Sequence, residues 1–130
     1  EGELPVLNTV SQVAMMYGIP FSDPIPEVEK FIKEGDLIIF GNTSLVSIFT
    51  PGHSPASLSF YCKESKFIIA GDVLFHESIG RTDLPGGNYN TLISSIKDNL
   101  FPLGDDIEVY PGHGPKTTIG YEKASNPFLV

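Results

Sequence analysis

Two Pro-Gly-His tripeptides, each placed directly after an apolar run, constrain this chain more than any other feature of its sequence. A further apolar run between them ends in Gly-Asp. Three runs therefore end in a side chain that can bind a metal ion: residues 45–49 lead to His53, residues 66–70 to Asp72, and residues 107–110 to His113. Because short apolar runs bounded by Pro and Gly are typical of strands, the sequence predicts a fold in which three strand ends carry these candidate ligands.

Imidazole and carboxylate side chains bind transition metals, and they do so best when the loops that carry them are already stiff. Proline fixes φ and glycine allows turns that a Cβ would forbid, so the Pro-Gly loops provide that stiffness at His53 and His113. Asp72 has two carboxylate oxygens, which can bridge two ions roughly 3.5–4 Å apart. Taken singly, each histidine fits an exposed loop equally well and Gly-Asp fits a simple turn, so the residues alone leave both interpretations open.

The remaining pattern predicts a mixed α/β chain. Strands are expected at residues 37–40, 45–49, 57–62 and 66–70, joined by turns at 41–43 and 63–65 into an antiparallel meander. Helices are expected at residues 8–17, with Asn8 or Thr9 as the cap and Gly18 past the end, at residues 90–99, and from about residue 118 to 124. A short helical turn is expected at residues 28–33, and residues 73–90 show no regular periodicity.

Charge and composition exclude several classes of function. The net charge is −8 and only eight Lys and Arg residues are present, which disfavours a nucleic-acid partner because phosphate neutralisation needs a basic patch. No apolar stretch approaches the ~20 residues that a membrane span needs, so no membrane partner is expected. The single cysteine, Cys62, excludes an internal disulfide and is expected to be a small buried side chain, consistent with a cytoplasmic protein.

Four further residues lie between the second and third candidate ligands. His76 follows Asp72 by four residues, and we interpret it as a loop histidine rather than an extra ligand. Arg81 and Asp83 are expected to form a structural ion pair beneath the site, with Arg81 as a secondary candidate for lining a substrate pocket. Tyr89 is another secondary candidate for that pocket, and a buried aromatic side chain is the alternative interpretation.

The order of these motifs resembles the second half of the metallo-β-lactamase superfamily, in its glyoxalase II-like (hydroxyacylglutathione hydrolase-like) branch of short, single-domain bacterial proteins. The resemblance rests on Thr-Pro-Gly-His at 50–53, Gly-Asp at 71–72, Gly-Arg-Thr-Asp at 80–83, the helix-like run 90–96, Pro-Gly-His-Gly at 111–114 and the ending at 120–129. It implies an α/β (α+β) fold, namely the C-terminal part of a four-layer αβ/βα sandwich with mainly antiparallel strands.

In that family, the residue matching His53 binds a first metal ion, the residue matching His113 binds a second, and the residue matching Asp72 bridges the two. Zinc is the first expectation, with iron or manganese as alternatives. The family's His-x-His-x-Asp-His motif supplies the other four ligands, and no histidine precedes His53 in this sequence. Residues 1–130 are therefore expected to be the C-terminal portion of a single domain with an incomplete metal site, and to dimerise or to associate with the missing N-terminal portion.

The resemblance implies a binuclear metallohydrolase, in which a water activated by the two ions that Asp72 bridges attacks the carbonyl of a small-molecule thioester of the acyl-glutathione type. Glyoxalase II enzymes carry Glu-Tyr after the last ligand, where this chain has Gly114 and Pro115, so glutathione recognition stays open. Two alternatives are kept: a mononuclear iron persulfide dioxygenase, which uses ligands matching His53 and Asp72, and a non-catalytic fragment or module. Residues 1–130 alone are expected to be inactive.

Overall fold

The computed structural model describes residues 1–20 and 23–130, and the chain divides into two compact units, residues 1–31 and residues 32–130. The first unit contains helices α1 (Leu4–Leu7) and α2 (Val10–Met16). The helix predicted at residues 8–17 is confirmed as α2, with Thr9 in the capping position and Gly18 in a left-handed conformation (φ +65°) beyond its end. All three candidate ligands lie in the second unit.

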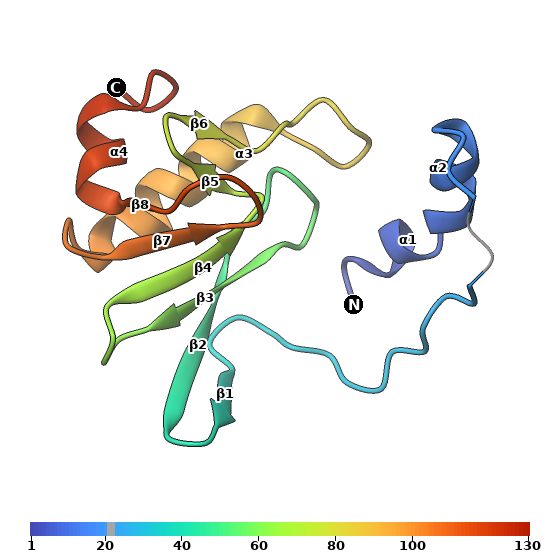
Figure 1. Ribbon diagram of the computed structural model, residues 1–130, viewed down its shortest axis with the longest axis horizontal. Coiled ribbons are helices and arrows are strands. Elements are labelled where there is room, and N and C mark those ends of the chain that lie inside the picture. The colour runs from blue at the N-terminus through green and yellow to red at the C-terminus, as the bar shows by residue number, and fades with distance from the viewer. Residues whose placement is uncertain (21–22) are drawn as a thin grey trace. The chain divides into compact units, whose positions relative to one another are not determined.

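A six-stranded sheet runs through the second unit, in the order β1-β2-β3-β4-β7-β8 (Figure 1). Its strands are β1 (Leu37–Phe40), β2 (Thr43–Phe49), β3 (Leu58–Cys62), β4 (Phe67–Gly71), β7 (Glu108–Pro111) and β8 (Thr117–Thr118). Every neighbouring pair is antiparallel except β4 and β7, which run parallel. The predicted meander, and with it a mixed α/β fold with mainly antiparallel strands, is confirmed.

Two of the four helical segments of the second unit begin at side-chain caps. The four segments are α3 (Tyr89–Ser94), its π-helical continuation η1 (Ser95–Leu100), the 3-10 turn η2 (Phe101–Leu103) and α4 (Ile119–Ser125). The side-chain oxygen of Asn88 accepts a hydrogen bond from the Thr91 amide at the start of α3. The hydroxyl of Thr118 accepts one from the Tyr121 amide at the start of α4. Both helices therefore start with one otherwise unpaired amide satisfied, where the sequence predicted them.

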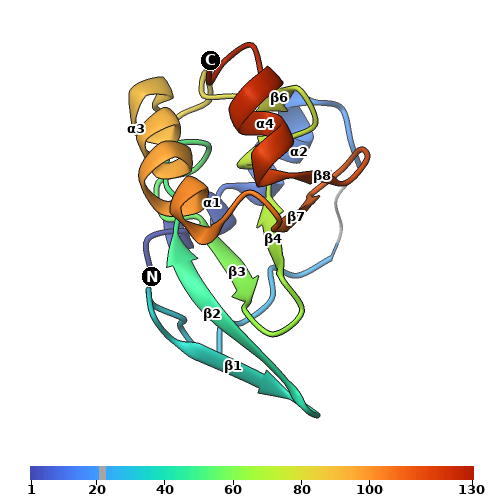
Figure 2. The same ribbon diagram turned by 90° about the vertical axis from the view of Figure 1, so that its left-hand side faces the viewer.

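Side chains that alternate along the strands give the sheet one face that is well buried over β4 and β7 but not over β2, where Val46 is 37% exposed. Val46, Tyr61, Ile68 and Val109 are cross-strand neighbours and so point to the same side. Ile68 and Val109 are fully buried in a core that also takes apolar side chains from the helical segments, namely Leu92, Ile96, Leu100 and Ile119. Figures 1 and 2 show α3 and α4 on this side of the sheet.

The opposite face of the sheet is also apolar but is partly exposed. Phe60, Ile69 and Tyr110 are cross-strand neighbours on it. Ile69 and Tyr110 keep 42% and 39% of their surface exposed. At the edge of the sheet, Ile39 and Phe40 of β1 are exposed as well, on opposite faces. Exposed apolar side chains on a sheet are typical of a region that contacts another polypeptide.

Two short segments differ from the sequence-based expectation. Residues 28–33 form no helical turn, because so short a segment after Pro24 and Pro26 gains too few hydrogen bonds to offset the cost of helix nucleation. Residues 73–90 contain a small antiparallel hairpin, β5 (Leu74–Phe75) and β6 (Ser78–Ile79). Strands of this length are too short to show a periodic pattern.

Two expectations from composition can be compared with the structure. Cys62, expected to be a small buried side chain, lies on β3 and is only 1% exposed. Within the described ranges, no helix is both long enough and apolar enough to cross a membrane.

Ile68→Ala and Ile69→Ala form a matched pair, because the two isoleucines are neighbours on β4 that point to opposite faces. Ile68 is fully buried, whereas Ile69 is 42% exposed. We expect Ile68→Ala to lower the free energy of unfolding by about 2–5 kcal/mol and Ile69→Ala to lower it by less than about 1.5 kcal/mol. Urea denaturation of both variants measures the difference, and equal losses would contradict the assignment of the buried face.

Candidate metal centre

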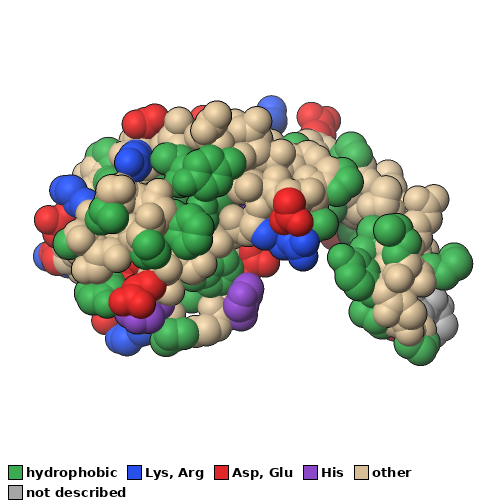
Figure 3. Space-filling model, turned by 90° about the horizontal axis from the view of Figure 1, so that it is seen from above, with side chains coloured by type: hydrophobic (Ala, Val, Ile, Leu, Met, Phe, Trp, Pro, Cys, Tyr) green, Lys and Arg blue, Asp and Glu red, His purple; other side chains and the backbone are tan. Residues whose placement is uncertain are grey.

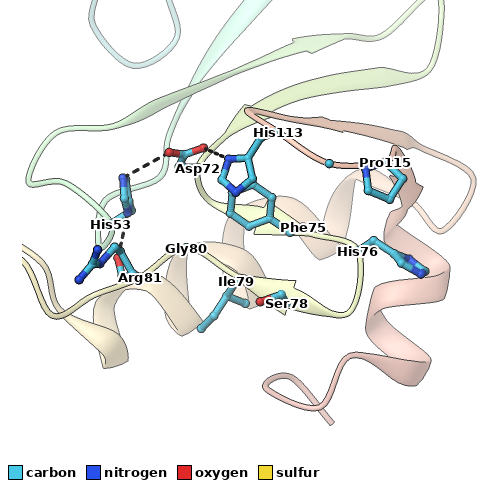
Figure 4. Close-up of a pocket in the computed structure, with 11 residues that line it drawn as sticks. His53, Asp72, Phe75, His76, Ser78, Ile79, Gly80, Arg81, His113 and Pro115 are labelled. Atoms are coloured by element: carbon cyan, nitrogen blue, oxygen red, sulfur yellow. Dashed lines mark hydrogen bonds and ion pairs between the residues drawn. The ribbon is translucent and has the colours of Figure 1, made fainter. Parts of the chain in front are cut away.

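The three candidate ligands meet at one edge of the sheet. Strands β2 and β4 each pair antiparallel with β3, and β7 pairs parallel with β4, so β2, β4 and β7 all run in the same direction. Their C-terminal ends therefore lead into His53, Asp72 and His113 at the same edge. Nε2 of His53 lies 3.7 Å from Oδ2 of Asp72, and Nδ1 of His113 lies 3.4 Å from Oδ1 (Figure 4). The two imidazoles thus face different oxygens of one carboxylate.

The loop that carries His53 is held against the continuous helical segment formed by α3 and η1. Ser95 and Asn99 of η1 donate side-chain hydrogen bonds of 2.7 and 2.9 Å to backbone carbonyls in this loop and at the end of β2. Gly52 has a φ of +130°, and a Cβ there would stand only 2.4 Å from the backbone nitrogen of Leu92. Only glycine permits both this conformation and this close approach, so the backbone beneath His53 has little freedom to move.

A backbone contact fixes which nitrogen of His53 is available as a ligand. Nδ1 of His53 lies 2.9 Å from the carbonyl oxygen of Arg81. A carbonyl oxygen only accepts hydrogen bonds, so Nδ1 must carry the proton and Nε2 keeps its lone pair, on the side that faces Asp72. Metal-binding histidines commonly donate their second ring N–H to a backbone carbonyl in this way, which orients the ring.

Two glycines leave room around Asp72. A Cβ at Gly112 would stand 2.2 Å from Oδ1 of Asp72, and a Cβ at Gly80 would stand 1.9 Å from its backbone oxygen. The amide of Gly112 also donates a 2.8 Å hydrogen bond to the carbonyl of Gly71. The second Pro-Gly-His loop can approach the carboxylate only because position 112 has no side chain.

His113 stands at the surface, unlike the more enclosed His53. Its side chain is 76% exposed, compared with 24% for His53, and Figure 3 shows histidine side chains at the molecular surface. The ring of His113 lies against Phe75, with ring centroids 4.4 Å apart. An apolar contact on one side and Asp72 on the other thus set the position of this imidazole.

A cavity of about 400 Å³ opens beside Asp72. It is lined by His53, Asp72, Phe75, His76, Ser78, Ile79, Gly80, Arg81, His113, Gly114 and Pro115 (Figure 4). The candidate ligands stand along one end of it, and the apolar side chains of Phe75, Ile79 and Pro115 form much of the remaining wall. Small-molecule sites commonly combine apolar walls with a few converging polar groups.

The secondary candidates for the pocket are placed differently from one another. Arg81 lines the cavity, whereas Tyr89, at the start of α3, is 48% exposed and is not among the lining residues.

Arg81 and Asp83 form the expected ion pair, with Nε–Oδ1 and Nη2–Oδ2 distances of 2.9 and 2.7 Å. The pair is exposed at the rim rather than beneath the site, and its hydrogen bonds lower the pKa of Asp83 to about 2. His76 lies in the turn between β5 and β6 and also lines the cavity.

The three candidate ligands do not complete a metal site by themselves. Over residues 1–20 and 23–130, no group of three or more His, Cys, Asp or Glu side chains is placed so that it could hold a metal ion. The carboxylate of Asp72 lies between His53 and His113 and faces each ring with a different oxygen. A zinc ion takes four ligands, so a metal ion bound here would need ligands beyond these three side chains.

Sequence reasoning missed three residues whose side chains hydrogen-bond to the backbone of the loops around the site. Ser95, Asn99 and Glu122 hold loops that carry candidate ligands or line the cavity. Glu122 is fully buried although it is charged, which is rare for a residue without a specific partner. Its helical position was predicted, but its role depends on contacts with residues such as Glu77, 45 positions away, which leave no local signal.

Comparisons with known proteins show what this chain is similar to. The family model described as the metallo-beta-lactamase superfamily matches residues 3–113. Hydroxyacylglutathione hydrolase GloC of Haemophilus influenzae is 43% identical over 124 residues, which are 95% of this chain and 58% of that protein. The probable metallo-hydrolase YqgX of Bacillus subtilis is 50% identical over 96 residues, which are 74% of this chain and 45% of that protein. The chain therefore spans about half the length of these curated relatives.

A solved structure gives the same result for the fold. The crystal structure of TTHA1623 in a di-iron-bound form superposes on 98% of this chain, with a TM-score of 0.86 and 37% sequence identity. The match covers 62% of that protein.

Gly112→Ala tests the close approach at the candidate centre. The added Cβ would stand 2.2 Å from Oδ1 of Asp72, so we expect it to separate His113 from the carboxylate and to weaken metal binding by roughly 10–100-fold, with the secondary structure kept. Gly114→Ala is the comparison: its φ of +80° strains any side chain, but the added Cβ has no atom within 4 Å, so it alters the same loop without a collision with Asp72. Isothermal titration of the whole protein with Zn²⁺ measures both, and equal affinities for the two variants would contradict the role of Gly112.

Proposed function

Because this chain belongs to the metallo-beta-lactamase superfamily, we propose that the whole protein is a metal-dependent hydrolase with a binuclear centre. The observation that carries the proposal is the pair of imidazoles on the two oxygens of Asp72. In the proposal, His53 and Asp72 hold one ion, and His113 and Asp72 hold the other. The remaining ligands would come from outside these three residues.

The chain's own residues would orient the reacting groups. Bound divalent ions polarise a carbonyl group and lower the pKa of water to roughly 7, so no serine or cysteine nucleophile is needed. The Arg81 carbonyl holds His53 in the tautomer that presents Nε2, and Phe75 holds His113 from the other side. The apolar wall at Phe75 and Ile79 suits the alkyl part of an acyl group.

We further propose that the substrate is a thioester of the acyl-glutathione type. The support is the 43% identity to a protein named hydroxyacylglutathione hydrolase over 95% of this chain. A cavity of about 400 Å³ is at the size of a small-molecule site. Zinc is the metal proposed first. Iron and manganese remain alternatives, since imidazole and carboxylate ligands accept all three, and the di-iron form of TTHA1623 is consistent with iron.

Asp72→Asn in the whole protein tests the function directly. Asparagine keeps the shape of the side chain but removes its charge and one of the two acceptor oxygens, so it cannot be shared between two cations in the same way. We expect the hydrolysis of S-lactoylglutathione to fall by at least about 100-fold and the metal content to fall below two ions per chain. Thiol release and elemental analysis are the measurements.

The matched control for this variant is Asp106→Asn. Asp106 is an exposed carboxylate paired with Lys66, and it does not line the cavity. Its substitution should leave hydrolysis and metal content unchanged. Unaltered activity in Asp72→Asn would contradict the proposed centre.

The rival reaction, a mononuclear iron persulfide dioxygenase, predicts different products. That enzyme would consume O₂ and release sulfite from glutathione persulfide, and it would contain one iron ion per protein. Hydrolysis without O₂ consumption, in a protein with two ions, favours the hydrolase. The same assays, run side by side on the whole protein, therefore separate the two proposals.

We also propose that residues 1–130 need a polypeptide partner, either a second copy or the N-terminal portion found in longer relatives. The partly exposed face with Phe60, Ile69 and Tyr110 would be covered by that partner. Expressed alone, residues 1–130 should dimerise or aggregate and should show no thioester hydrolysis. Light scattering combined with the thiol assay measures both properties, and an active monodisperse monomer would contradict the proposal.

A further inference from the structure

Glu122 is a fully buried carboxylate on α4 that the proposed metal chemistry does not use. Three hydrogen-bond donors and one imidazole surround its two oxygens. Oε1 accepts from the Thr117 hydroxyl (2.5 Å) and lies 3.5 Å from Nδ1 of His76, whereas Oε2 accepts from the Glu77 amide (3.0 Å) and the Asn126 side-chain amide (2.7 Å). Each of the two buried oxygens therefore has at least one donor.

Most of this network holds one turn, residues 76–78 between β5 and β6. Asn126 donates a second hydrogen bond, of 3.0 Å, to the carbonyl of Ser78. Glu77 has a φ of +55°, a left-handed conformation that is unfavourable for any residue except glycine. Its amide is held by Glu122, and its carboxylate accepts a 2.5 Å hydrogen bond from the Tyr121 hydroxyl. The helix α4 thus keeps the turn in a conformation that it would not adopt alone.

The turn and its hairpin supply much of the cavity wall. Of the eleven lining residues, five come from this region, namely Phe75, His76, Ser78, Ile79 and Gly80. His76 is the one among these five that carries a titratable side chain. Figure 4 shows His76 at the opposite end of the lining residues from His53 and Asp72, away from the proposed reacting centre.

The orientation of His76 is set from α4. Its ring stacks on Tyr121, with centroids 5.1 Å apart and an interplanar angle of 24°, and Nδ1 faces Glu122. A carboxylate oxygen attracts a nitrogen that carries a proton, so Nδ1 is the ring nitrogen directed at Glu122 and Nε2 is the one directed away from it. The side chain is 41% exposed, and His76 is among the residues that line the cavity.

We propose that His76 contacts the substrate at a point away from the reacting carbonyl, and that Glu122 is the positioning residue that orients it. The inference rests on the proposed function, because it assigns a substrate contact within the same cavity. Nε2, the ring nitrogen that does not face Glu122, is the atom that would contact a polar group of the thioester. His76 thereby determines specificity, and Glu122 acts only through His76 and its turn.

The test compares His76→Ala, Glu122→Gln and the double variant in the whole protein. The substrates are S-lactoylglutathione, S-lactoylcysteamine, which lacks most of the thiol part, and S-acetylglutathione, which has a shorter acyl part. With S-lactoylglutathione, His76→Ala should raise KM roughly tenfold and leave kcat within about twofold. That increase should disappear with one of the two shortened substrates, which shows where the contact lies. An increase that persists with both, or no increase at all, overturns the proposal.

The double variant separates positioning from a general structural role. If Glu122 acts through His76, then Glu122→Gln raises KM in the wild-type background but changes it less than about twofold in the His76→Ala background. Independent increases overturn the positioning role. If Glu122→Gln fails to fold, the test on His76→Ala still decides the substrate contact, because His76 is a partly exposed turn residue.

Lys123→Gln is the matched control, since Lys123 lies on the same helix but pairs with Asp105 outside the cavity. Its KM should equal that of the wild type. ¹⁵N NMR of the His76 ring adds a readout without turnover: Nδ1 should be protonated in the wild type, and Glu122→Gln should change the tautomer. An unchanged ring spectrum overturns the positioning role. If the wild type hydrolyses none of the thioesters, the proposed function fails and the substrate contact fails with it, whereas the NMR result still decides the positioning.

Discussion

One carboxylate, Asp72, faces two imidazoles, and the remainder of the site depends on that arrangement. The carboxylate can serve both rings only because three strands end at the same edge of the sheet. It also requires glycine at positions 80 and 112, where a Cβ would collide with Asp72. The parallel pairing of β4 with β7 is the decisive step, because it places His113 beside Asp72 although 41 positions separate them in the sequence.

The two sides of the cavity are fixed by different helices that share one hydrophobic core. The loop of His53 is held by Ser95 and Asn99 of η1, and the turn of His76 is held by Glu122 of α4. Ile96 of η1 and Ile119 of α4 are both buried in the same cluster against the sheet. The distance between the candidate metal ligands and the opposite wall of the cavity is therefore set by core packing rather than by loop conformation.

The sequence predicted the features that have a local cause. Apolar runs and Pro-Gly turns predicted the strands of the meander, and residues such as Thr118 predicted a helix start, because these preferences act over a few neighbouring residues. The candidate ligands could be singled out because each follows such a run, and their meeting at one edge of the sheet could be expected from it. Glu122 was not, since its partners His76 and Glu77 lie more than 40 positions away, and neither was the hairpin β5–β6, whose two-residue strands are shaped by tertiary contacts.

Anomalous X-ray diffraction from crystals of the whole protein with its metals bound is the most direct measurement of the central claim. The account predicts two anomalous peaks roughly 3.5–4 Å apart, one contacted by His53 and the other by His113, with the Asp72 carboxylate in contact with both. A single ion bound by both histidines, or a metal site that leaves Asp72 without a metal contact, would contradict it.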